Sequence, residues 1–99
     1  MKSKTFSLTL TPAQLGAVAE AWLGYADAAY PPGASECAQV ARSTLLASAD
    51  ALQQQANGGP PAPLRRRQRA ILKAAVAWYY SEEGPGNPAD ASELLSAFP

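Results

Sequence analysis

The sequence contains no histidine and a single cysteine, Cys37. Histidine is the usual general base near neutral pH and a common transition-metal ligand, so its absence removes the commonest catalytic and metal-binding chemistry. A lone cysteine cannot form an internal disulfide, which favours a reducing compartment. Without a histidine to activate the thiol, we expect Cys37 to be a small buried packing residue. The sequence therefore predicts no catalytic residue, no cofactor and no metal site.

Long hydrophobic runs are missing as well. No stretch approaches the length of a membrane span, and the N-terminus lacks the apolar core of a signal peptide, so we expect a soluble cytoplasmic protein without membrane contact. The hydrophobic fraction of 47% includes 22 alanines, which bury little area, and only 11 leucines. Residues 1–99 suit a single small domain with a modest core, and burial shared across a dimer would stabilise such a chain.

Four segments have the pattern of amphipathic helices. Thr11-Pro12-Ala13-Gln14 forms a capping box that opens the first helix, which Pro31-Pro32-Gly33 ends. Ser35 is the expected cap of the second helix, and Asn57-Gly58-Gly59 is its stop signal. A third helix is predicted over residues 64–80, and a short fourth follows Asn87-Pro88.

The residues before these helices form a short strand. From Lys4 to Leu10, polar and apolar side chains alternate with the period of two that is typical of a half-buried strand. The fold class is therefore mainly α, a compact bundle of three longer helices and a short C-terminal one, preceded by a short N-terminal β-strand or extended arm. The expected core consists of Phe6, Leu8, Leu10, Leu15, Val18, Trp22, Val40, Leu45, Leu52, Ile71, Leu72, Ala75, Trp78, Leu94, Leu95 and Phe98.

Nothing else in the sequence resembles a mate for that strand. Unpaired backbone N–H and C=O groups are costly to bury, so either a second chain supplies the pairing or the segment is an arm that lies on the helices. We expect the first, a homodimer whose seam is formed by the strand that carries Thr5, Ser7 and Thr9.

Charge is unevenly distributed although it sums to zero. Residues 64–81 hold five bases and no acid, and residues 82–99 hold four acids and no base. On the predicted third helix Arg65, Arg66, Arg69 and Lys73 share one side, joined by Tyr80. Cations are disfavoured at a helix N-terminus, so this placement suggests a binding face.

Three explanations of that face are open. It is a solvated face that pairs with Glu82, Glu83, Asp90 or Glu93, a face for an acidic protein partner, or a face for nucleic-acid phosphate. Nucleic acid is the less favoured partner, because the chain has no net positive charge. The carboxylate pairs are poor catalytic candidates, since they lie in an expected exposed turn and short helix.

The order of strand, capped helix, turn and second helix resembles the ribbon-helix-helix family of DNA-binding dimers. The matching residues are Thr5 to Leu10 for the ribbon, Pro12 to Tyr25 for the first helix, and Gly33-Ala34-Ser35-Glu36 for the opening of the second. The resemblance covers about half of the chain and implies that two chains pair their strands, with Thr5, Ser7 and Thr9 as base readers.

Taken together, these features predict a small protein-protein interaction or regulatory module that self-associates and performs no catalysis. A ribbon-helix-helix-like transcriptional regulator, which would bind DNA through the strand or the arginine face, is the alternative.

Overall fold

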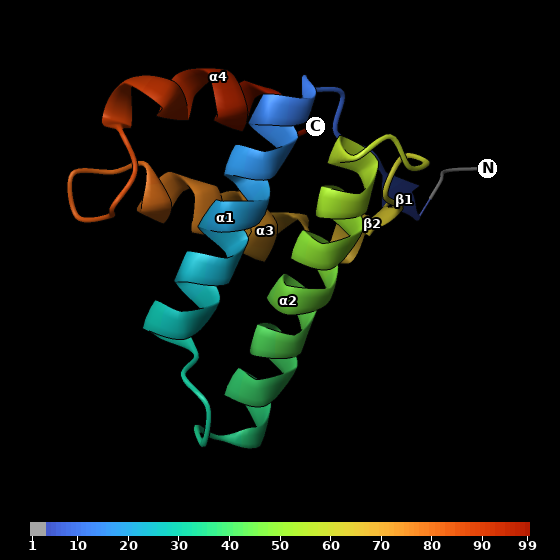
Figure 1. Cartoon of the computed structure of the whole chain (residues 1–99). Coiled ribbons are helices and arrows are strands. Elements are labelled where there is room, and N and C mark those ends of the chain that lie inside the picture. Colours follow the sequence, from blue (N-terminus) through green and yellow to red (C-terminus); the bar gives the residue numbers. More distant parts are fainter. Residues whose placement is uncertain (1–3) are drawn as a thin grey trace.

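The structure, a computed structural model, describes residues 4–99. Helices α1 and α2 form an antiparallel hairpin, α3 crosses it, and α4 covers its upper end, with a two-stranded sheet at one side (Figure 1). This arrangement confirms the expected mainly α bundle of three longer helices and a short C-terminal one behind a short N-terminal strand. The elements, in order, are β1 (Thr5–Phe6), α1 (Pro12–Ala29), α2 (Glu36–Ala56), β2 (Leu64–Arg65), the 3₁₀ turn η1 (Arg66–Gln68), α3 (Arg69–Tyr79), the 3₁₀ turn η2 (Pro88–Asp90) and α4 (Ala91–Ser96).

The predicted caps of the two long helices are confirmed. Thr11 Oγ1 accepts a hydrogen bond from the Gln14 amide at 3.2 Å, and Gln14 Oε1 accepts one from the Thr11 amide at 3.0 Å. Ser35 Oγ accepts from the Ala38 amide at 3.3 Å, which satisfies a free N–H at the start of α2. Local sequence therefore sets where the hairpin helices begin.

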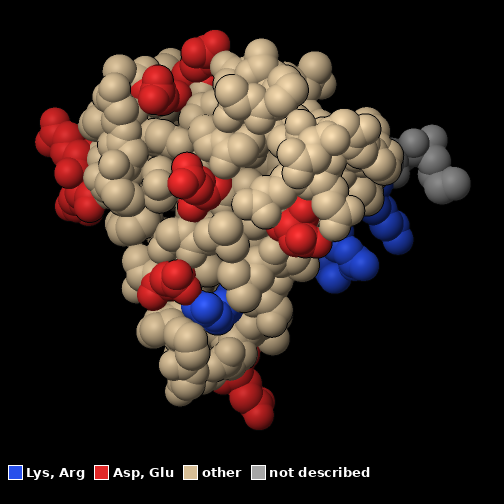
Figure 2. Space-filling view, in the orientation of Figure 1, with Lys and Arg blue, Asp and Glu red and all other residues tan. Residues whose placement is uncertain are grey.

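The molecule tapers towards the turn that joins α1 to α2 (Figures 1 and 2). Here α2 packs on α1 and makes few contacts with α3, so the first turns of α2 have no second layer above them. Two expectations are wrong for this reason. Val40, expected in the core, is 67% exposed, and Cys37, expected to be buried, is exposed.

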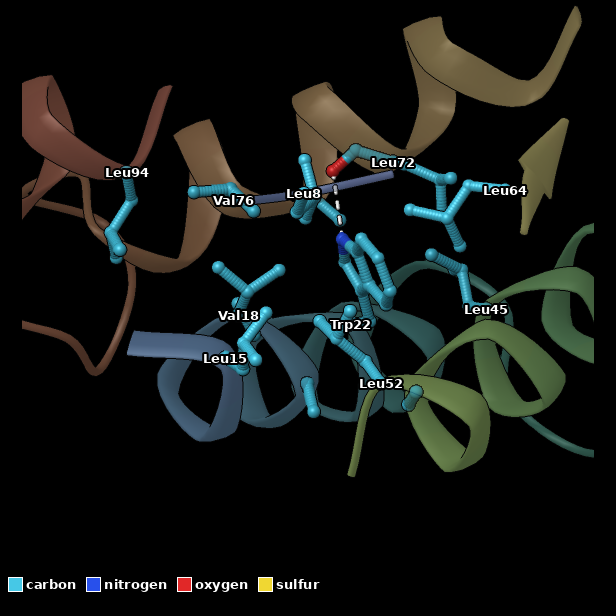
Figure 3. Close-up of a cluster of buried hydrophobic side chains, with 14 of the residues drawn as sticks. Leu8, Leu15, Val18, Trp22, Leu45, Leu52, Leu64, Leu72, Val76 and Leu94 are labelled. Atoms are coloured by element: carbon cyan, nitrogen blue, oxygen red, sulfur yellow. Dashed lines mark hydrogen bonds between the residues drawn. The ribbon is translucent and has the colours of Figure 1, made fainter. Parts of the chain in front are cut away.

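The core lies higher, where α1, α3 and the upper half of α2 meet. The Trp22 side chain is fully buried there, and its Nε1–H donates to the Leu72 carbonyl oxygen at 2.9 Å (Figure 3). This bond satisfies the one polar atom of the indole, which would otherwise be costly to bury. Most of the predicted core is confirmed; Leu10, Ile71, Trp78 and Leu95 are only partly buried. The buried members of the prediction are Phe6, Leu8, Leu15, Val18, Trp22, Leu45, Leu52, Leu72, Ala75, Leu94 and Phe98.

The N-terminal strand is paired within its own chain. β1 is antiparallel to β2, with Thr5 opposite Arg65 and Phe6 opposite Leu64. The Arg66 amide also donates to the Lys4 carbonyl oxygen at 2.9 Å. The expectation that a second chain must supply the pairing is therefore wrong, and the strand is two residues long rather than the whole segment from Lys4 to Leu10.

The mate was missed because it lies in residues that we expected to be helical. The third helix begins at Arg69 and not at Leu64. Three consecutive arginines are a poor helix start, because the macrodipole opposes cations at a helix N-terminus. The chain instead forms one extended pair of residues and a 3₁₀ turn before α3.

Replacing Trp22 by Phe tests the core bond. The variant loses the donor to Leu72 and part of the buried ring, so we expect the free energy of unfolding to fall by about 2–3 kcal/mol in urea denaturation. The matched control is Trp78→Phe. Trp78 is only partly buried and its indole makes no hydrogen bond within residues 4–99, so its loss should stay near 1 kcal/mol. Equal losses would contradict this account of Trp22.

Candidate interaction surface

Six cationic side chains gather where the sheet meets the start of α3. We refer to them as the basic surface: Lys4, Arg65, Arg66, Arg67, Arg69 and Lys73, all exposed. Of the predicted partner-binding residues, Arg69 and Lys73 lie on α3 as expected, whereas Arg66 lies in η1 and Arg65 on β2. Lys4 and Arg67 were not part of the prediction. Lys4 joins the surface because its backbone bonds Arg66 across the sheet, which alternation in the sequence does not reveal.

No Asp or Glu side chain among residues 4–99 forms an ion pair with the basic surface. The one ion pair in this part of the chain joins Arg42 Nη1 to Asp27 Oδ1 at 2.9 Å, away from the basic surface. Arg69 donates a hydrogen bond to the Pro99 carbonyl oxygen, and the other five cations make no side-chain hydrogen bond with residues 4–99. The expected pairing with Glu82, Glu83, Asp90 or Glu93 is not formed.

Those four carboxylates lie at the other end of α3, and we call them the acidic end. Figure 2 shows Lys and Arg side chains at its right edge, with an acidic side chain close to them, and further Asp and Glu side chains over its left and upper parts. The 11 residues of α3 span about 16 Å at 1.5 Å per residue. This exceeds the screening length of about 8 Å at physiological salt, so the two ends act as separate charged surfaces.

A hydrogen-bonded glutamine fixes the chain that leads into the basic surface. Gln55 Nε2 donates to the Leu8 carbonyl oxygen at 3.1 Å, and Gln55 Oε1 accepts from the Ala62 amide at 2.8 Å. Ser7 Oγ donates to the Ala62 carbonyl oxygen at 3.3 Å. Ala62 is thus buried and held from both sides, while Pro60, Pro61 and Pro63 around it are exposed.

The predicted strand residues Thr5, Ser7 and Thr9 are exposed, and Phe6 and Leu8 between them are buried, which confirms the alternation. Thr5 and Ser7 make contacts within the chain, through the sheet and through Ala62. Their role as a dimer seam therefore no longer has the unpaired strand as its support.

Tyr80 does not belong to the basic surface, and this prediction is wrong. Its side chain is 6% exposed, and its hydroxyl donates to the Ala17 carbonyl oxygen at 3.1 Å. Tyr80 follows the last helical residue, Tyr79, so the helical wheel that placed it beside the arginines does not apply. The turn after α3 also covers it, because Gly86 lies so close that a Cβ there would clash with the Tyr80 ring.

Aromatic rings form a second surface, near the acidic end. The ring of Tyr25 contacts Tyr30 at 5.8 Å and Trp78 at 5.6 Å between centroids, and Trp78 contacts Tyr79 at 6.4 Å. These four residues, which we call the aromatic cluster, are all partly buried. Gly24 admits the Tyr79 ring against α1, since a Cβ at that position would lie 2.9 Å from it. Sequence spacing did not reveal the cluster, because it joins two helices through a tertiary contact.

One shallow cleft lies between α1 and the acidic end. Its volume is about 190 Å³, and its lining includes Asp90, Glu93 and Gln14, whose Nε2 donates to Glu93 Oε1 at 3.0 Å. Both carboxylates are exposed. Residues 4–99 contain no group of three potential metal ligands, and no helix there is long and apolar enough to cross a membrane.

Comparison with protein-family models, with curated proteins and with solved structures finds no match to this chain.

Replacing Gln55 by Ala tests whether the glutamine holds the chain before the basic surface. The Ala62 amide and the Leu8 carbonyl would lose their partner, so we expect the free energy of unfolding to fall by about 1–2 kcal/mol. Hydrogen exchange of the Ala62 amide should become faster. Gln53→Ala, at an exposed position two residues away, is the control and should change stability by less than about 0.5 kcal/mol. An unchanged exchange rate at Ala62 would show that the Gln55 side chain does not hold this segment.

A pH titration tests the environment of two tyrosines. Burial, and then the neighbouring Tyr30, raises the pKa of Tyr25, and burial, followed by Tyr79, Glu20 and Asp90, raises the pKa of Tyr80. A raised pKa in the folded state means that the stability these groups contribute is complete below the unfolded value of about 10 and is lost as pH rises through the folded values. Phenolate absorbance should therefore appear at higher pH in the native protein than in urea. Coincident titration curves would contradict the burial of Tyr80.

Proposed function

We propose that this chain is a small protein-protein interaction module without catalytic activity, and that its basic surface binds an acidic segment of a partner protein. The observation that carries the proposal is that none of the six cations forms an ion pair with an Asp or Glu side chain within residues 4–99. Arginine suits this role, since its planar fork holds a carboxylate in two-point contact. Because the sheet and the hydrogen bonds of Gln55 fix the backbone, the arginines are positioned before a partner arrives.

The placement of the charges supports a role in binding, because the dipole of α3 disfavours charges of these signs at its two ends. The cations lie at the positive end of the α3 dipole, and Glu82 and Glu83 follow its negative end. Each such charge is unfavourable by a few tenths of a kcal/mol, roughly. A partner whose charges complement either end would reverse that penalty.

Binding to a protein fits these observations better than binding to DNA. The ribbon-helix-helix arrangement needs β1 to pair with a second chain, whereas β1 pairs with β2 of its own chain. Nucleic acid would then depend on the arginines alone, in a chain whose net charge is zero. We also propose a cytoplasmic location, where the exposed thiol of Cys37 stays reduced. Self-association forms part of the proposal and is argued separately below.

The binding proposal is tested with a fluorescently labelled peptide of about ten glutamates, with fluorescence anisotropy as the measurement. We expect the full chain to bind it, with affinity that falls as salt is added, because exposed ion pairs are screened. Arg65→Gln with Arg66→Gln should weaken binding about tenfold, since two exposed contacts of about 0.7 kcal/mol each are lost.

The matched control is Ala89→Glu with Ser92→Glu, which changes net charge by the same amount at exposed positions beside the acidic end. This variant should bind the peptide like the unmodified chain. Equal weakening by both variants would show that net charge, and not the basic surface, governs binding. Tighter binding to a labelled DNA duplex than to the peptide would overturn the choice of a protein partner.

A further inference from the structure

The segment before the basic surface has the properties of a polyproline II ligand. Proline fixes φ near −65° at Pro60, Pro61 and Pro63, and the residue before each proline is restricted to extended geometry, so residues 59–63 favour the polyproline II region. Pro60 and Pro63 are exposed and stand one turn apart, about 9 Å at 3.1 Å per residue. The bonds that hold Ala62 fix this segment against the body, and Arg65 follows two residues later. Such segments bind surfaces lined by aromatic rings.

The aromatic cluster has the matching chemistry. Tyr25, Tyr30 and Trp78 present partly exposed rings in mutual contact, and Tyr and Trp are the residues most enriched at binding hot spots. Glu82 and Glu83 follow α3 a few residues beyond Trp78 and are exposed, with no ion pair among residues 4–99. Aromatic rings and unpaired carboxylates therefore lie together at the end of α3 that is opposite the arginines.

We propose that the chain associates head to tail with a second copy of itself, the Pro60–Pro63 segment and its arginines docking on the aromatic cluster and on Glu82 and Glu83 of the neighbour. This inference rests on the proposed function, and it names the acidic partner. Prolines then meet aromatic rings, and arginines meet carboxylates. A single chain cannot join these surfaces, because α3 holds them at opposite ends.

The geometry of such a contact sets the form of the assembly. Different surfaces of the two copies meet, so a bound pair still has one free proline segment and one free aromatic cluster. Association therefore continues into chains or closes into rings. This differs from the symmetric dimer that strand pairing would give, in which two copies satisfy each other completely.

Complementary variants test the proposal by sedimentation velocity of the full chain. The proline variant is Pro60→Ala with Pro63→Ala. The cluster variant is Tyr30→Ala with Glu82→Lys and Glu83→Lys. Pro32→Ala alters an exposed proline that no arginine directly follows, and is the control. Circular dichroism checks that each variant is folded, and Glu82→Lys with Glu83→Lys alone replaces the cluster variant if the tyrosine change lowers the helical signal.

We expect the unmodified chain to associate at protein concentrations between roughly 10 µM and about 1 mM. Its dissociation constant should be at least tenfold higher at about 500 mM salt than at about 50 mM. The control should behave in the same way, whereas the proline variant and the cluster variant should each be monomeric alone. An equimolar mixture of those two should form a complex of two chains and nothing larger, because only one complementary pair of surfaces remains.

Three results would overturn the proposal: an unmodified chain that stays monomeric throughout this range, variants that still associate on their own, or a mixture that remains monomeric. The proposed function is judged separately by the glutamate peptide. A monomeric chain that binds the peptide refutes the head-to-tail contact and leaves the basic surface as a site for another acidic protein. Failure to bind the peptide counts against the proposed function itself.

Discussion

The buried indole of Trp22 is the constraint on which the arrangement of this protein depends. Its ring fills the space between the helical hairpin and α3, and its N–H is bonded to the carbonyl of Leu72 in the first half of α3. This attachment is directional, because the bond requires the carbonyl to face the indole. Together with the bond from the Tyr80 hydroxyl to Ala17, it holds α3 across the hairpin, so that the two ends of α3 extend to opposite sides (Figure 1). The separation of the basic surface from the acidic end follows from this crossing.

A net charge of zero hides this separation. The cations and carboxylates are equal in number, but along α3 they reinforce the helix dipole instead of opposing it. The resulting molecule is strongly dipolar although it is neutral overall. In such a molecule the local field at each end, and not the total charge, decides which partners approach and in which orientation.

The sequence was sufficient for features that are set locally. The capping box at Thr11, the alternation of Phe6 and Leu8, and the apolar stripe around Trp22 each follow from neighbours a few residues apart, and each is confirmed. The features it did not reveal depend on contacts between distant residues. Leu64 and Arg65 become a strand only because β1 lies beside them, and periodicity over two residues has no detectable signal. Val40 has the pattern of a core residue, but no other element covers the first turns of α2, so it is exposed.

The candidate site shows the same division. The run of arginines was evident from the sequence, whereas the position of Lys4 beside Arg66 and the contact of Tyr25 with Trp78 required the tertiary structure. Tyr80 was misplaced because the helical wheel was extended one residue past the end of α3. Function could therefore be inferred from composition only as far as the sign of the charge, and the arrangement of that charge came from the fold.

The antiparallel pair of β1 and β2 also has a consequence for the order in which the molecule folds. Thr5 and Arg65 are separated by nearly two thirds of the chain, so the loop between them must close before their pairing is formed. The α1–α2 hairpin, in contrast, involves near neighbours and can form early, as local contacts generally do. We therefore expect Lys4 to reach Arg66 only after the helices have docked. On this account the six cations come together only in the completed fold, and a partially synthesised or partially folded chain lacks the assembled basic surface.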